Sequence, residues 1–161
     1  MIRTILRGAT LRRDAYLRMV LSSNGVADGL LIVAAVQVLI GFLILGRGLG
    51  VVDRVSIVLG GIFGWVILGG LIYLIGKHLL AGYGSFPGVA AAASLAFPPT
   101  LLVVPLSYLV TPRQAWLIAS AWMVACLWMA ARVALDLSPD RAVLTAGGGW
   151  IAWVILSTFL F

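Results

Sequence analysis

The sequence predicts an all-α membrane protein with five transmembrane helices, preceded by a basic N-terminal segment. Of the 161 residues, 63% are hydrophobic and 10% are charged, and the mean hydropathy is +1.15. Soluble domains keep about a quarter of their residues charged, so this chain lacks the polar surface that water requires. The apolar residues form continuous runs, whereas membrane-spanning strands alternate apolar and polar positions. These observations favour a helical membrane bundle.

The N-terminal segment, residues 1–25, is predicted to hold an amphipathic helix at the membrane surface. Placed on a helix at about 100° per residue, Ile2 to Leu21 gathers its apolar side chains on one side. These are Ile2, Ile5, Leu6, Ala9, Tyr16 and Val20, and Arg3, Arg7, Asp14 and Arg18 lie opposite them. Gly8 weakens the middle of this helix.

The arginines of this segment are candidate contacts for lipid or for a protein partner. They are Arg3, Arg7, Arg12, Arg13 and Arg18. In the headgroup plane their apolar stems would lie along the membrane while the guanidinium groups reach phosphate. A topogenic signal that only fixes orientation needs the same charges, so both interpretations stay open.

Residues 26–161 are predicted to form the transmembrane domain. A transmembrane helix needs about 20 apolar residues, and charges and turn residues delimit five such runs. They are residues 26–46, 55–76, 89–110, 114–135 and 142–161. The first run is longer than the apolar core of a cleaved signal peptide, and no small-x-small cleavage site follows it. We therefore expect it to be a retained anchor.

The basic residues predict the orientation. With an odd number of spans, the N-terminal segment shares its side with Lys77, Arg132 and Arg141, which gives that side eight basic residues. The opposite side has three, namely Arg47, Arg54 and Arg113. Because cytoplasmic loops carry the excess of Lys and Arg, we expect the N-terminus in the cytoplasm and the C-terminus outside. Arg, Ala and Gly in place of Lys, Asn and Glu favour a bacterial inner membrane.

The net charge of +6 also indicates the kind of partner. Basic residues at span edges fit anionic lipid headgroups, and other membrane proteins are expected neighbours of such a bundle. The base-reading and stacking arrangements of nucleic-acid binders are absent. We therefore expect no nucleic-acid partner.

Few polar residues lie inside the predicted spans. Asp28 and Asp53 stand at span beginnings, where a carboxylate suits the helix dipole, and Arg132 and Asp136 are spaced as an interfacial ion pair. Gln37 is the polar residue near a span centre, where a single amide is typical of an interhelical hydrogen bond. The scarcity of buried carboxylates argues against proton-coupled transport, and less against a passive pore.

No catalytic or metal site is predicted. Cys126 and His78 are each the only residue of their kind, so neither a cysteine metal site nor a pair of His ligands can form. His78 lies beside Lys77 at a span end, which is typical of an interfacial residue. Axial ligation of a haem or chlorophyll by His78 is the alternative, and otherwise we expect no cofactor.

Glycine marks the second predicted span. Gly60 and Gly64 form a G-x-x-x-G pair, and Gly69 and Gly70 follow. Small residues let helix backbones approach closely. We therefore expect these glycines at helix contacts and the second span in the interior of the bundle.

Proline marks the third predicted span. Pro98, Pro99 and Pro105 remove backbone donors, so this helix must kink or break. Such a break survives in a membrane where protein or water satisfies the freed backbone groups. A static kink and a moving hinge both fit these prolines.

A polar stretch, "GKHLLAGYGSFPG", separates the second and third predicted spans. Its polar, glycine and aromatic positions include Lys77, His78, Gly82, Gly84, Ser85 and Phe86. Glycine permits a tight turn, and Pro87 is suited to the first turn of the next helix. We expect a cytoplasmic turn here.

The order of these features resembles the Yip1 domain family. "RRDAYLRM" precedes five spans, "AGYGSFPG" follows the second, and proline interrupts the third. Bacterial members often show a Gly-Gly-x-Gly-Ser-Phe-like turn at this point. Gly82, Gly84, Ser85 and Phe86 match that turn, and Ala81 stands where a first Gly is common. The resemblance implies a five-span protein with a cytoplasmic N-terminus and no known chemistry of its own.

Three functions fit the sequence. The first is a non-catalytic inner-membrane protein of Yip1-like type that acts through helix packing and through lipid or protein contacts. The second is an accessory subunit of a larger respiratory or photosynthetic complex. The third is a small pore or carrier in which the broken third helix moves.

Overall fold

The fold is described from a computed structural model, which describes residues 2–43 and 50–160. Within these residues, five helical stretches are long and apolar enough to cross a membrane. They cover Gly25–Phe42, Val51–Leu79, Phe86–Leu106, Pro112–Ala134 and Pro139–Phe159. The predicted fold class and its five spans are confirmed. The predicted span ends at residues 46 and 161 lie outside the described residues.

Two short helices, α1 (Ile2–Ala9) and α2 (Arg13–Leu21), precede the spans. The first, second, fourth and fifth spans are α3 (Gly25–Leu43), α4 (Val51–Leu74) with the π-helical turn η1 (Ile75–Leu79), α7 (Pro112–Ala134) and α8 (Pro139–Leu160). The third span is divided into α5 (Phe86–Ala93), the 3₁₀ turns η2 (Ser94–Ala96) and η3 (Pro98–Leu102), and α6 (Val103–Leu106).

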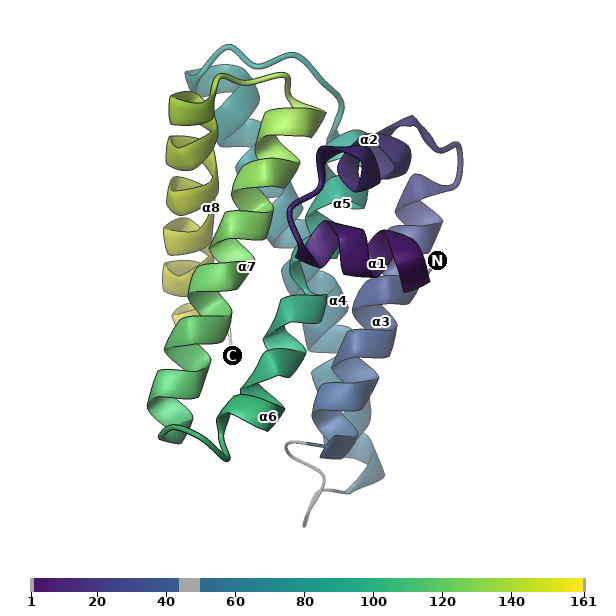
Figure 1. The fold of residues 1–161 in the computed structure, drawn as a ribbon, viewed down its shortest axis with the longest axis vertical. Coiled ribbons are helices and arrows are strands. Elements are labelled where there is room, and N and C mark those ends of the chain that lie inside the picture. Colours follow the sequence, from purple (N-terminus) through teal and green to yellow (C-terminus); the bar gives the residue numbers. More distant parts are fainter. Residues whose placement is uncertain (1, 44–49, 161) are drawn as a thin grey trace.

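The spans lie side by side, and α1 and α2 lie across one side of the bundle (Figure 1). The turn between η1 and α5 and the turn between α7 and α8 are at the same end as α2 (Figure 1). The C-terminal end of α8 is at the opposite end. This arrangement is the one that an odd number of spans requires.

Local sequence signals explain where several helices begin. The Asp53 carboxylate accepts a hydrogen bond of 3.0 Å from the Gly50 backbone N–H, as expected for an acidic residue in a first turn. Thr111 and Gln114 form a reciprocal capping box at the start of α7. Ser85 caps α5 by accepting a hydrogen bond of 3.4 Å from Gly88 N–H, and Pro87 lies in the first turn.

The third span, rather than the second, occupies the centre of the bundle. Every residue of 88–97 is buried, and in the most apolar 18 residues of each span 67% are buried in the third span against 28% in the second. The expectation that the Gly-rich second span is interior is therefore wrong. The physical reason is the alanine run 90–93, whose small side chains let α2, α3, α4 and α7 all approach α5.

The predicted break of the third span is confirmed. α5 ends at Ala93, and Pro98 and Pro99 begin η3 after one intervening 3₁₀ turn. Side-chain hydroxyls satisfy backbone carbonyls on both sides of the break. Ser94 Oγ donates to the Ala91 carbonyl at 2.7 Å, and Thr100 Oγ1 donates to the Phe97 carbonyl at 2.6 Å. α6 then ends one residue after Pro105.

Candidate functional site

The basic N-terminal segment forms two helices instead of the single expected helix. α1 and α2 are joined by a reversal at residues 10–12, where Leu11 adopts a φ of 58°. The Arg7 guanidinium and the Asp14 carboxylate meet across this reversal at 3.1 Å. The periodicity of Ile2 to Leu21 could not indicate the break, because the break depends on contacts between this segment and the bundle. We call residues 2–21 the arm.

The arm is anchored through the C-terminal carbonyls of α1, which have no partners within that helix. Tyr16 is completely buried, and its hydroxyl donates to the Gly8 carbonyl at 2.9 Å. Trp122 of α7 donates from its indole N–H to the Ala9 carbonyl at 2.9 Å. Burial raises the pKa of the Tyr16 phenol far above its usual value, so this donor keeps its proton at physiological pH.

Gly8 has a specific role in this anchor. It is buried, and a Cβ added to it would lie 3.0 Å from Leu95 Cδ1 of the third span. The residue that weakens an isolated helix therefore permits the close approach of α1 to η2. Tertiary packing outweighs helix propensity at this position.

Anchoring the arm creates a basic notch between α1 and α2. The notch has a volume of about 170 Å³ and is lined by Arg3, Thr4, Arg7, Asp14, Ala15 and Arg18. A neighbouring hollow shares Thr4 and Arg18 and extends to Ser22 and Asp28. Three guanidinium groups against one carboxylate give the notch a net positive charge.

The structure therefore brings together three of the five candidate arginines. Arg12 and Arg13 are exposed and lie outside the lining of the notch. The helical placement of Ile2 to Leu21 already grouped Arg3, Arg7 and Arg18 on one side, and the reversal at Leu11 brings them around one volume.

A second candidate site is a cavity within the membrane-spanning bundle, which we call the inner cavity. It has a volume of about 420 Å³ and lies among α3, α4, η3, α7 and α8. Its polar and aromatic lining includes Gln37, Thr100, Trp116, Ser120, Trp150 and Trp153. None of the described residues that line it carries a charge. Thr100 places the broken stretch of the third span at its wall.

Two glycines of α4 shape the inner cavity. The Gln37 side chain occupies the space that a Cβ at Gly61 would fill, and the Trp153 indole nitrogen would lie 3.4 Å from a Cβ at Gly64. Gln37 has no hydrogen-bond partner in the part of the chain that the structure describes. The expected interhelical hydrogen bond of Gln37 is therefore not formed, and its amide belongs to the cavity wall.

The other predicted packing glycines have different surroundings. A Cβ at Gly69 would lie 3.5 Å from Ala90 Cα, so Gly69 lies at the contact with α5. Gly70 has only the Phe86 ring at 4.0 Å, and Gly60 is partly exposed. The G-x-x-x-G pair therefore does not form one packing face. Gly64 and Gly69 approach different neighbouring helices.

The turn between the second and third spans is tied to the turn between α7 and α8. Gly82 N–H donates to the Gly76 carbonyl at 2.8 Å, and Tyr83 N–H donates to the Leu135 carbonyl at 2.7 Å. A Cβ at Gly84 would collide with the Ala134 carbonyl oxygen. The glycines of this turn therefore serve close backbone approach. Ala81 adopts a φ of 54°, the left-handed conformation that favours glycine.

The charged and aromatic residues of this turn form a small cluster at the membrane end. Lys77 Nζ donates to the Tyr73 hydroxyl at 2.8 Å, and the Phe86 ring centroid lies 6.1 Å from that of Tyr73. His78 is exposed, and its ring packs edge-on to Tyr73 at 6.3 Å.

The predicted ion pair of Arg132 with Asp136 is wrong. The Arg132 guanidinium lies over the Trp128 ring, 5.9 Å from its centroid. Asp136 is in the turn after α7 with a φ of 50°, so the helical spacing that would pair the two residues is lost.

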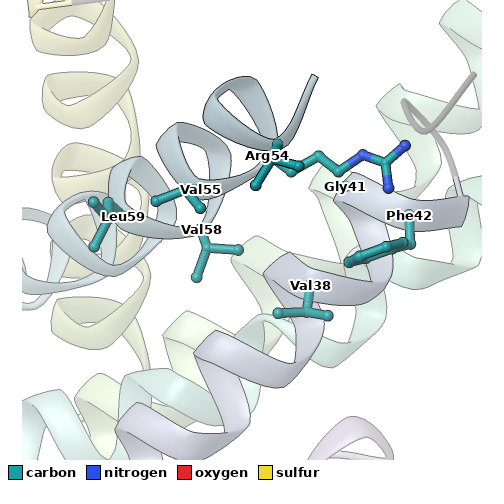
Figure 2. Close-up of a pocket in the computed structure, with 8 residues that line it drawn as sticks. Val38, Gly41, Phe42, Arg54, Val55, Val58 and Leu59 are labelled. Atoms are coloured by element: carbon teal, nitrogen blue, oxygen red, sulfur yellow. The ribbon is translucent and has the colours of Figure 1, made fainter. Parts of the chain in front are cut away.

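An apolar pocket lies at the opposite end of the bundle, between the end of α3 and the start of α4. Figure 2 shows Val38 and Phe42 of α3 facing Val55 and Val58 of α4. The Arg54 guanidinium carbon lies 4.8 Å from the centroid of the Phe42 ring. This lining suits acyl chains, with the arginine able to reach towards the headgroups.

The comparisons with known proteins place the whole bundle in one family model. The model of the Yip1 domain matches residues 10–161. Neither the curated proteins nor the solved structures contain a match.

Proposed function

We propose, from the premise that this chain belongs to the Yip1 domain family, that it acts without catalysis by binding anionic lipid headgroups in the basic notch. The family and the five apolar helices make it an integral, multi-pass membrane protein. The anchored arm is the observation that carries the finer proposal. A free basic segment attracts anionic lipid diffusely, whereas an anchored one holds its guanidinium groups in a fixed arrangement.

The chemistry of the notch fits a phosphate. Arginine presents a planar fork of donors that matches phosphate oxygens, and Arg3, Arg7 and Arg18 surround one small volume. The Asp14 carboxylate lies 3.1 Å from the Arg7 guanidinium. Because this ion pair already restricts the Arg7 side chain, less conformational entropy is lost when it binds a ligand. Thr4 adds a hydroxyl at the same wall. Arg12 and Arg13 supply the diffuse attraction that any basic surface has for an anionic leaflet.

We place the arm at the cytoplasmic face of a bacterial inner membrane. The turns at the end of the bundle next to α2 (Figure 1) adjoin η1, which contains Lys77, and the start of α8, which contains Arg141. A basic excess is typical of the cytoplasmic side. The Arg141 guanidinium donates to the Leu80 carbonyl at 3.2 Å, so Arg141 joins the two turns of this end.

Lipid titration of the gently solubilised protein, followed by native mass spectrometry, tests this proposal. We expect the double variant Arg3→Gln/Arg18→Gln to bind phosphatidylglycerol at least about tenfold more weakly, since each charge-assisted hydrogen bond contributes roughly 1.5–3 kcal/mol. The double variant Arg12→Gln/Arg13→Gln is the matched control, because it removes the same charge from the same arm outside the notch. Equal losses in the two variants, or equal binding of phosphatidylcholine, would refute a defined headgroup site.

A small pore or carrier is the second candidate function, and the inner cavity favours it. The cavity has neutral polar side chains within a mainly apolar lining, and it borders the broken stretch of the third span. Flux of a small neutral solute into liposomes tests this candidate. A flux that survives Pro98→Ala and Pro99→Ala unchanged would exclude a role for a moving break.

A further inference from the structure

The six tryptophans of the chain divide into two groups. Trp65, Trp122 and Trp128 donate from their indole N–H to backbone carbonyls at 2.9, 2.9 and 3.1 Å. The three tryptophans of the inner cavity, Trp116, Trp150 and Trp153, have no such partner within residues 2–43 and 50–160. These three indole groups therefore line one cavity; Trp116 is also 46% exposed, whereas Trp150 and Trp153 are half-buried.

The inner cavity holds further unused hydrogen-bonding groups. The Gln37 amide has no partner in the described part of the bundle, and the same holds for the Ser120 hydroxyl. Polar groups at this depth in a membrane have little water to bond to, and leaving them without partners costs free energy. Several neutral donors without partners around one cavity are typical of a ligand-binding site and not of side chains that only fill space.

The volume and the shape of the lining restrict the ligand. About 420 Å³ is within the range of small-molecule sites. Charged ligands are disfavoured, because the described lining offers no opposite charge. Indole rings at Trp150 and Trp153 provide flat apolar walls with N–H donors at their edges. An uncharged ring that carries acceptor oxygens fits both features.

From this geometry we infer that the inner cavity binds a lipid-soluble, uncharged ring compound with carbonyl oxygens, of the quinone class. The carbonyl oxygens accept hydrogen bonds from Gln37, Ser120 and the indole groups, and the ring lies against the tryptophans. The inference concerns binding alone, and it does not depend on the basic notch, which lies between α1 and α2.

Titration of the purified protein with decylubiquinone tests this inference through quenching of tryptophan fluorescence. We expect saturable quenching in the wild type and about tenfold weaker binding in Gln37→Leu, which removes the amide at similar volume and so roughly one neutral hydrogen bond. Trp128→Phe is the matched control, since the Trp128 indole already donates to the Pro139 carbonyl. Its binding constant should equal that of the wild type.

Stability measurements separate a binding role of Gln37 from a structural one. Because Gln37 has no hydrogen-bond partner among the described residues, Gln37→Leu should melt at the same temperature as the wild type or above it. Ser120→Ala should weaken decylubiquinone binding in the same direction. Quenching that is linear with concentration, or identical in the wild type and Gln37→Leu, overturns the inference.

The ester carbonyls of a glycerolipid are the competing source of acceptor oxygens. Dioctanoylglycerol should therefore displace decylubiquinone poorly, and decanol, which has a chain but no ring or carbonyl, should not displace it. If dioctanoylglycerol shows Gln37-dependent binding and decylubiquinone shows none, the ring assignment is overturned.

Discussion

Replacing Tyr16 should release the arm from the bundle. Tyr16 is completely buried, and its hydroxyl donates to the Gly8 carbonyl at 2.9 Å. Tyr16→Phe removes that hydrogen bond and keeps the ring, so the anchored state should lose about 1 kcal/mol. Tyr16→Ala also removes the ring, and truncation of a buried aromatic side chain costs about 3–5 kcal/mol.

Hydrogen exchange followed by mass spectrometry measures this loss directly. A cost of about 1 kcal/mol corresponds to roughly fivefold faster exchange of the arm amides in Tyr16→Phe, since about 1.4 kcal/mol is a factor of ten. In Tyr16→Ala the exchange should accelerate by about a hundredfold or more, up to the rate of an unanchored segment. Amides of the five spans should keep their protection in both variants.

Tyr83→Phe is the control for this experiment, because Tyr83 is 79% exposed in the turn between the second and third spans. It should leave the arm unchanged. If Tyr16→Ala exchanges its arm amides at the wild-type rate, Tyr16 does not anchor the arm. Equal acceleration in Tyr83→Phe would mean that the assay reports general destabilisation.

Three further predictions concern the turns and caps. Ala81→Gly should raise the free energy of unfolding by about 0.5–1 kcal/mol, and with it the melting temperature, because Ala81 holds a φ of 54° that is unfavourable for any side chain with a Cβ. A lower melting temperature would contradict the assigned backbone conformation. Gly84→Ala should lower the free energy of unfolding by at least about 2 kcal/mol, and with it the melting temperature, since its Cβ would meet the Ala134 carbonyl oxygen. Gly147→Ala is the control: no atom lies within 4 Å of the added Cβ, so this variant should be neutral or stabilising. Thr111→Val should cost about 1 kcal/mol in chemical denaturation, because the Thr111 hydroxyl caps Gln114 N–H at the start of α7; an unchanged midpoint would show that this cap contributes nothing.

The five apolar spans and the third-span break could be predicted because each depends on local sequence. Long apolar runs and the charges between them delimit the five spans, and no tertiary contact is needed to find them. Pro98 and Pro99 lack backbone N–H groups wherever they occur, so the loss of helical hydrogen bonds follows from the sequence alone. The turn at 76–88 was equally accessible, since Gly82, Gly84 and Pro87 restrict the backbone locally.

The arm and the order of burial could not be predicted in the same way. Gly8 lowers helix propensity in any sequence, but its contact with Leu95 and the burial of Tyr16 exist only in the folded bundle. Glycine in the second span indicated close approach without indicating which helices approach. The alanine run 90–93 is the better indicator of the central helix.

The inner cavity was also inaccessible from the sequence. Trp116, Trp150 and Trp153 come from two helices, and their common surroundings depend on how α7 and α8 pack. The i, i+3 spacing of Trp150 and Trp153 is a signal that they share a helix face. Nothing in that spacing indicated that Gln37 of the first span would lie at the same cavity.

Cysteine labelling in right-side-out membrane vesicles tests most directly whether the arm faces the anionic cytoplasmic leaflet. In a Cys126→Ala background, Arg12→Cys would report the arm, and Leu109→Cys would report the opposite end of the bundle, where Leu109 is 81% exposed. The proposed orientation predicts that an impermeant maleimide labels Leu109→Cys in intact vesicles and labels Arg12→Cys only after permeabilisation. Labelling of Arg12→Cys in intact vesicles would contradict it.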